Sequence, residues 1–82
     1  MPTLKIRFYH EGRTEPGSTV TIPGGILRFA SNMIPHRAKT ALDEKGVDID
    51  ELVRLSENPE ALGTVIEIED HDKNERVVVS LE

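Results

Sequence analysis

The chain contains no cysteine and no tryptophan, and its aromatic residues are one tyrosine and two phenylalanines among 82 residues. The lack of cysteine excludes disulfide scaffolds, thiolate zinc sites and cysteine nucleophiles. No apolar run approaches the ~18 residues that a membrane span needs, and residues 1–6 do not resemble a signal peptide. We therefore expect a cytoplasmic protein with no integral membrane association.

Basic residues are also few, because 10 Lys and Arg stand against 15 Asp and Glu, for a net charge of -5. Non-specific nucleic-acid binding depends on basic side chains that displace counterions, so nucleic acid is not expected as a partner. The hydrophobic fraction is 37%, which suits a globular protein. At this length we expect one core and a single domain over residues 1–82.

The first quarter of the chain has the alternating pattern of a β-hairpin. Leu4, Ile6 and Phe8 alternate with polar residues, which predicts a strand with one buried side. Turn-forming residues follow over 11–18, and Val20 and Ile22 then alternate with threonines. Two strands joined by a fairly long loop are therefore expected.

The apolar spacing changes after Pro23-Gly24-Gly25 from every second residue to a helical period. Ile26, Phe29, Ala30 and Met33 share this spacing and predict a short helix that buries their side. Pro35 is expected to open a second helix, whose apolar stripe is Ala38, Ala41 and Leu42.

A third helix is indicated by its boundaries. Gly46 suits a left-handed position at the end of the second helix, and Asp48 with Glu51 resembles a capping box. The helix should continue to about Ser56, before Asn58-Pro59 interrupts it.

The last part of the chain predicts a second hairpin, since apolar residues alternate on both sides of the polar stretch 70–75. The apolar positions are Ile66, Ile68, Val77, Val79 and Leu81. The predicted fold class is α+β, in the order ββαααββ: a four-stranded, mostly antiparallel sheet with short helices packed on one face. The first and last strands could be neighbours, as in β-grasp domains, and the sequence leaves their relative direction and the strand order open.

Residues that could carry chemistry have simpler structural explanations. Asp70, Asp72 and Asn74 alternate like the start of a calcium loop, but the glycine and glutamate that such a loop needs are missing, so a hairpin turn is favoured. His10, His36 and His71 lie on separate segments without a zinc-ligand spacing. We therefore predict no catalytic, cofactor-binding or metal-binding residues.

Two sets of apolar residues fall out of phase with the predicted core and are candidates for an interaction surface. Tyr9, Val65 and Val78 should lie on the outer face of the sheet, where an apolar cluster would suit a homodimer or a partner protein. Leu27 and Ile34 lie off the main stripe of the first helix, where core packing competes with contact to a partner or a membrane surface.

Several segments resemble small, stand-alone bacterial proteins of uncharacterised function of the Gram-positive type. The resemblance covers most of the chain and is carried by Ile22-Pro23, Ile26–Ala30, Ile34-Pro35, Gly46–Leu52 and Val65–Asp70. It implies a small α+β domain and brings no catalytic residues with it.

The sequence thus favours a non-enzymatic protein-protein interaction or regulatory module, with an unknown protein partner or self-association. The alternative is a small-ligand-binding domain or a subunit of an enzyme complex. That alternative requires a concave pocket with converging polar groups, for which His36, Arg37 and the Gly24-Gly25 turn are the candidates.

Overall fold

The computed structural model describes residues 2–70 and 74–82, which form four strands and a helical middle. The predicted calcium-like loop and His71 fall largely outside this part of the chain. The elements are β1 (Thr3–His10), β2 (Ser18–Pro23), η1 (Gly24–Ile26), α1 (Leu27–Ala30), η2 (Ser31–Met33), α2 (His36–Glu44), α3 (Ile49–Ser56), η3 (Pro59–Ala61), β3 (Val65–Asp70) and β4 (Glu75–Leu81).

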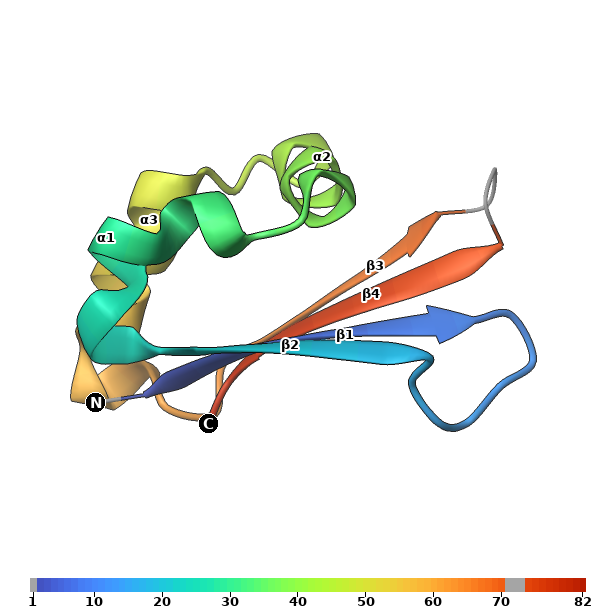
Figure 1. The fold of residues 1–82 in the computed structure, drawn as a ribbon, viewed down its shortest axis with the longest axis horizontal. Coiled ribbons are helices and arrows are strands. Elements are labelled where there is room, and N and C mark those ends of the chain that lie inside the picture. The colour runs from blue at the N-terminus through green and yellow to red at the C-terminus, as the bar shows by residue number, and fades with distance from the viewer. Residues whose placement is uncertain (1, 71–73) are drawn as a thin grey trace.

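The strands form one sheet in the order β2-β1-β4-β3, and every neighbouring pair is antiparallel. The prediction of an α+β fold made from two hairpins and a helical crossover is confirmed. The first and last strands are neighbours, as in a β-grasp domain, but they run antiparallel, whereas a β-grasp sheet pairs them in parallel. Figure 1 shows the helices on one side of the sheet and both chain ends at the same end of the strands.

The core lies between the sheet and the helical layer. On the core face of the sheet, Leu4, Ile6 and Phe8 of β1 are buried opposite Leu81, Val79 and Val77 of β4. The helices contribute Ala38 and Leu42 of α2 and Leu52 of α3. The alternation read in the sequence therefore assigned the buried face of the strands correctly.

The helix boundaries follow local side-chain chemistry. Asp48 caps α3 by accepting a hydrogen bond from the Glu51 backbone N–H at 2.8 Å. Gly46 has φ +77°, the left-handed conformation that glycine adopts without steric cost, and Pro35 directly precedes α2. The predicted starts and ends of these two helices are confirmed.

The first helix is where the prediction of the buried side is wrong. Residues 24–33 form two 3-10 turns flanking the short helix α1. Leu27 is fully buried and Ala30 is half-buried, whereas Ile26, Phe29 and Met33, which were predicted to face the core, are exposed. The segment is thus rotated relative to the prediction, and its second apolar stripe fills the core.

Arg37 of α2 connects the helical layer to the open end of the sheet. Its guanidinium lies 3.7 Å from the centroid of the Phe8 ring. It also donates a hydrogen bond to Ser18 Oγ at 3.1 Å and forms an ion pair with Glu75 at 3.3 Å. One side chain therefore links α2 to β1, β2 and β4.

Gly24 marks the closest approach between the helical layer and the chain start. A Cβ at this position would lie 2.1 Å from the backbone oxygen of Pro2 and 2.6 Å from that of Ser56. Both distances are shorter than the contacts that Cβ atoms make in proteins. The two oxygens belong to the backbone, so no side-chain rotation can relieve the clash. Only glycine fits where β2 turns into the helices.

Replacing Gly24 with alanine should destabilise the domain by about 3 kcal/mol, at the upper end of the range for overpacked sites. The adjacent Gly25 is exposed and does not have a positive φ, so Gly25→Ala is the matched control. Urea unfolding followed by circular dichroism measures both variants. Equal stabilities for the two variants would contradict the close approach at Gly24.

Candidate functional site

The outer face of the sheet, opposite the helices, carries the first candidate surface. Strand pairing places the residues predicted there on a diagonal: Tyr9 lies opposite Arg76, Val78 lies between Arg7 and Glu67, and Val65 lies opposite Ser80. Val65 is 61% exposed, while Tyr9 and Val78 are half-buried. Val78 is thus a diagonal neighbour of both Tyr9 and Val65, and the residues directly opposite Tyr9 and Val78 are charged.

Ion pairs cover much of this outer face. Arg76 lies over the Tyr9 ring, 4.6 Å from its centroid, and forms an ion pair with Glu67 at 3.2 Å. Lys5 and Arg7 on the same face both form ion pairs with Glu82, at 3.9 Å and 2.7 Å.

Glu82 is the centre of the polar network at the end of β4. Its carboxylate accepts hydrogen bonds from Arg7 and from Ser80 Oγ, each at 2.7 Å. The hydrogen bond from Arg7, followed by that from Ser80, lowers the pKa of Glu82 from its usual 4.5 to about 2. The same hydrogen bond raises the pKa of Arg7.

The helical layer presents a second surface, and here the prediction requires correction. Leu27 and Ile34 are 0% and 2% exposed, so both belong to the core and neither can contribute to an interaction surface. The core alternative was the right one for this pair. Leu27 and Ile34 are buried because the neighbouring helices leave part of the apolar face of the sheet uncovered, and these two side chains cover it.

The residues left outside instead are Ile26, Phe29 and Met33, which we call the Phe29 stripe. They follow one another at spacings of three and four along residues 24–33, which places them on one side of this helical segment. Their exposed fractions are 47%, 80% and 57%. Among the described residues, this is the largest set of exposed bulky apolar side chains on one continuous segment, and it extends over η1, α1 and η2.

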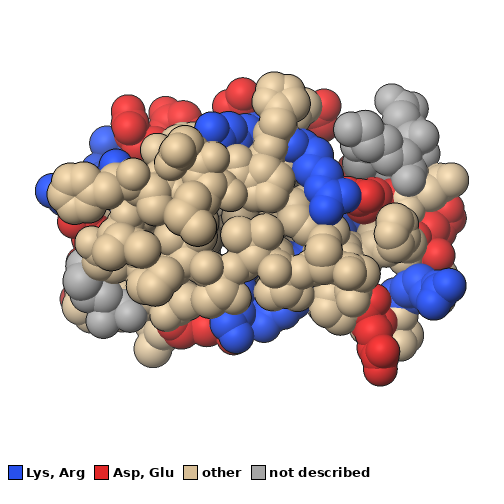
Figure 2. Space-filling view, in the orientation of Figure 1, with Lys and Arg blue, Asp and Glu red and all other residues tan. Residues whose placement is uncertain are grey.

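The surface beside the stripe carries little charge. Strand β2, which leads directly into η1, contains no charged residue from Ser18 to Pro23. Figure 2 shows uncharged surface extending over α1 and along the β2 edge, with the charged side chains gathered mainly around its border. The apolar stripe therefore opens onto a broad uncharged area.

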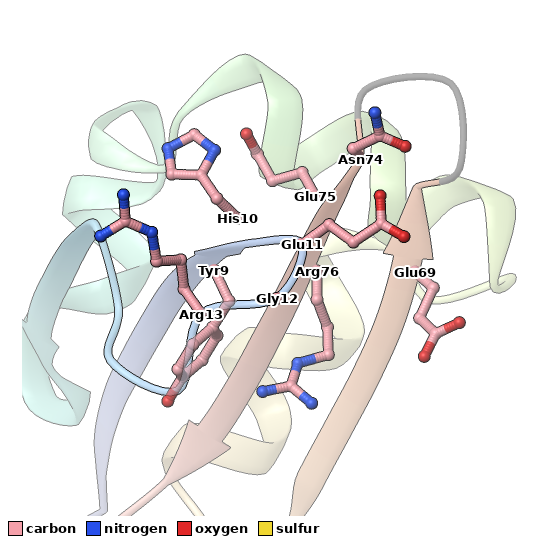
Figure 3. Close-up of a pocket in the computed structure, with 9 residues that line it drawn as sticks. All are labelled: Tyr9, His10, Glu11, Gly12, Arg13, Glu69, Asn74, Glu75 and Arg76. Atoms are coloured by element: carbon pink, nitrogen blue, oxygen red, sulfur yellow. The ribbon is translucent and has the colours of Figure 1, made fainter.

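A cavity of about 220 Å³ lies at the opposite end of the sheet, between the two hairpin ends. Figure 3 shows the side chains of His10 and Glu75 on one side of the strands and those of Tyr9 and Arg76 on the other, and Glu69 points away from the rest. Glu75 is paired with Arg37, and Arg76 with Glu67 and Tyr9, so these lining groups already have partners within the fold. None of His36, Arg37 or Gly24, the group expected to form a ligand pocket, lines this cavity.

Other predicted sites are also placed by the structure. His36 is exposed, and its Nε2 lies 3.5 Å from Thr40 Oγ1. Gly24 packs against two carbonyl oxygens, which would repel an anion. Over residues 2–70 and 74–82 no group of three or more metal-ligating side chains converges, and no helix there has the length and apolarity of a membrane span.

Comparison with known proteins gives one result. The sequence model described as "YvlB-like protein, C-terminal domain" matches residues 2–80. The chain belongs to this family. The match to the YvlB-like domain spans nearly the whole chain, from the start of β1 to one residue before the end of β4, so all the elements described above lie within the matched region except for that last residue. No curated protein and no solved structure matches significantly.

The Glu82 network predicts a pH dependence of the domain's stability. Because folding lowers the pKa of Glu82, its ionised form favours the native state above the unfolded pKa of 4.5. This contribution is lost as the pH falls from about 4.5 to about 2. Glu82→Gln should therefore reduce stability at pH 7 and have little effect near pH 2.

Urea midpoints at the two pH values measure this difference. Glu44→Gln is the matched control, because it removes one exposed carboxylate at the end of α2, away from Arg7. A Glu82→Gln variant that loses as much stability at pH 2 as at pH 7 would refute the assigned network.

Proposed function

We propose that this domain is a non-enzymatic protein-interaction module that binds a partner protein through the Phe29 stripe. The observation that carries the proposal is the exposure of Phe29, whose ring is 80% accessible on the surface of a small domain with only three aromatic residues. A contiguous set of bulky apolar residues in water is costly, and such sets are typical of binding surfaces.

The geometry of the stripe suggests how a partner would recognise it. Apolar side chains at positions i, i+3 and i+7 of a helical segment are the anchors that enter an apolar groove of another protein. Arg28, between Leu27 and Phe29, forms an ion pair with Glu57 of α3 at 2.5 Å. This ion pair keeps the Arg28 charge to one side of the Phe29 stripe. We therefore infer a protein partner with an apolar groove.

Two other binding partners, a bilayer surface and a small ligand, have less support. A bilayer surface would need basic residues around the stripe to attract anionic lipid, and the chain carries a net charge of -5. A small ligand in the hairpin cavity would have to compete with the ion pairs of Glu75 and Arg76. The proposal keeps the expectation of a cytoplasmic protein, in line with the absence of cysteine.

The test uses Phe29→Ser, with Val65→Ser as the matched control because it removes another exposed apolar side chain, from the outer face of the sheet. Partners captured from the native cell by the wild-type domain are purified, and their affinity for each variant is measured by calorimetry. Phe29→Ser should weaken binding by roughly 30-fold or more, as loss of a central anchor does. Val65→Ser should leave the affinity unchanged.

Measuring stability distinguishes a loss of binding from a loss of folding. Phe29→Ser should change the unfolding free energy by no more than about 0.5 kcal/mol. A partner whose affinity falls with Val65→Ser and not with Phe29→Ser would contradict the proposal. Binding of the wild-type domain to anionic vesicles, abolished by Phe29→Ser, would assign the stripe to a membrane surface instead.

A further inference from the structure

Strand β2 forms an open edge of the sheet. It pairs with β1 on one side, and the strand order places it at the end of the sheet, opposite β3. The outward N–H and C=O groups of an edge strand are a template on which a further strand can pair. In Figure 1, β2 runs along the near edge of the sheet without a helix in front of it.

The two edges of the sheet are protected unequally. Natural edge strands are blocked by charged residues, proline, bulges or a covering segment. β3 carries Glu67 and Glu69, whereas β2 has only the proline at its last position. Ser18, Thr19 and Thr21 are exposed and Val20 is half-exposed, so the stretch from Ser18 to Ile22 is open to pairing.

Charge decides which strand fits this edge. The chain carries a net charge of -5, so most contacts between two copies would bring like charges together. Two β3 edges would place glutamates against glutamates. Two β2 edges meet without any charged residue on either strand, so a second copy of the same strand fits here.

We propose that two copies of this domain pair through β2, antiparallel about a two-fold axis, to form one eight-stranded sheet. The open stretch runs from Ser18 to Ile22, because Pro23 lacks a backbone N–H, and its midpoint is Val20. With the axis at Val20, Thr19 of each copy lies opposite Thr21 of the other, a favourable cross-strand pair. The two Val20 side chains meet on the core side, and both helical layers lie on the same face.

A two-fold arrangement is closed, since each copy offers the same surface that it binds. Pairing of β2 with the β3 edge of another copy would instead extend without limit. The cations near β2 are already paired within the copy: Lys5 and Arg7 with Glu82, and Arg37, which bonds to Ser18, with Glu75. They are therefore less available to attract the β3 glutamates of another copy. This dimer uses a different surface from the Phe29 stripe and does not depend on the proposed function.

The first test is Thr19→Glu combined with Thr21→Glu. Within one copy, position 19 lies opposite Arg7 and position 21 opposite Lys5, so the new carboxylates face cations and the fold is retained. Between copies they face each other. Sedimentation equilibrium should show a mass between one and two copies that rises with concentration for the wild type, and a dimer roughly tenfold weaker for the variant at low salt. Added salt should restore part of the loss.

The control is Glu67→Lys combined with Glu69→Lys on the opposite edge, which should not weaken the two-copy dimer. A wild-type protein that stays monomeric at all concentrations overturns the proposal. So does a dimer that responds to the β3 variant and not to the β2 variant, since that pattern belongs to pairing of β2 with β3. Phe29→Ser should not affect the dimer. The dimer and the binding of a partner by the Phe29 stripe can therefore be refuted independently of each other.

Cross-linking tests the register of the β2 pairing. Because the chain has no cysteine, each single cysteine substitution introduces one thiol per copy. Under oxidation, Val20→Cys should form a disulfide-linked dimer faster than Thr19→Cys or Thr21→Cys, because only the residue on the axis faces its own copy. Val65→Cys on the other edge is the control. Equal rates at Val20 and Val65 would indicate random collision and contradict the paired β2 edge.

Discussion

The structure depends on covering one apolar face of a four-stranded sheet with helical segments that are each too short to do it alone. The longest, α2, has nine residues, and α1 has four. The β1 and β4 strands at the centre present Leu4, Ile6, Val77 and Val79 to this layer. Each helical segment must therefore turn its best-fitting apolar side inward, and the side that remains is left in water. The burial of Leu27 and Ile34 and the exposure of Phe29 are two results of the same constraint.

The opposite face of the sheet is organised by charge. Arg76 lies over the half-buried Tyr9 ring, and Arg7 lies opposite the half-buried Val78. The charged ends of Arg76 and Arg7 pair with Glu67 and Glu82. Glu82 also has a structural role in the β1-β4 pairing, where its backbone N–H and C=O both bond to Thr3.

The strands, the caps and the element order could be predicted from the sequence because each depends on neighbouring residues. Alternation in β1 and β4, Gly46 and the Asp48–Glu51 pair are local signals. The side of residues 26–34 that faces the core could not be predicted, since two apolar stripes share the helical spacing and the polar residues Arg28, Ser31 and Asn32 lie more nearly opposite the stripe that is exposed. Only the shape of the sheet decides between them. The pairing of Lys5 and Arg7 with Glu82 was missed for a similar reason, because it required knowing that β1 and β4 are antiparallel.

The Phe29 stripe of this YvlB-like domain thus consists of apolar side chains that the core excludes, and its exposure depends on the orientation of the first helical segment. The most direct measurement compares the unfolding free energies of Leu27→Ala and Phe29→Ala with that of the wild type. The account predicts a loss of about 2–5 kcal/mol for Leu27→Ala, as for other buried leucines. It predicts a change of no more than about 0.5 kcal/mol for Phe29→Ala. A large loss at Phe29 with little at Leu27 would show that the segment packs with its other side inward and would contradict the account.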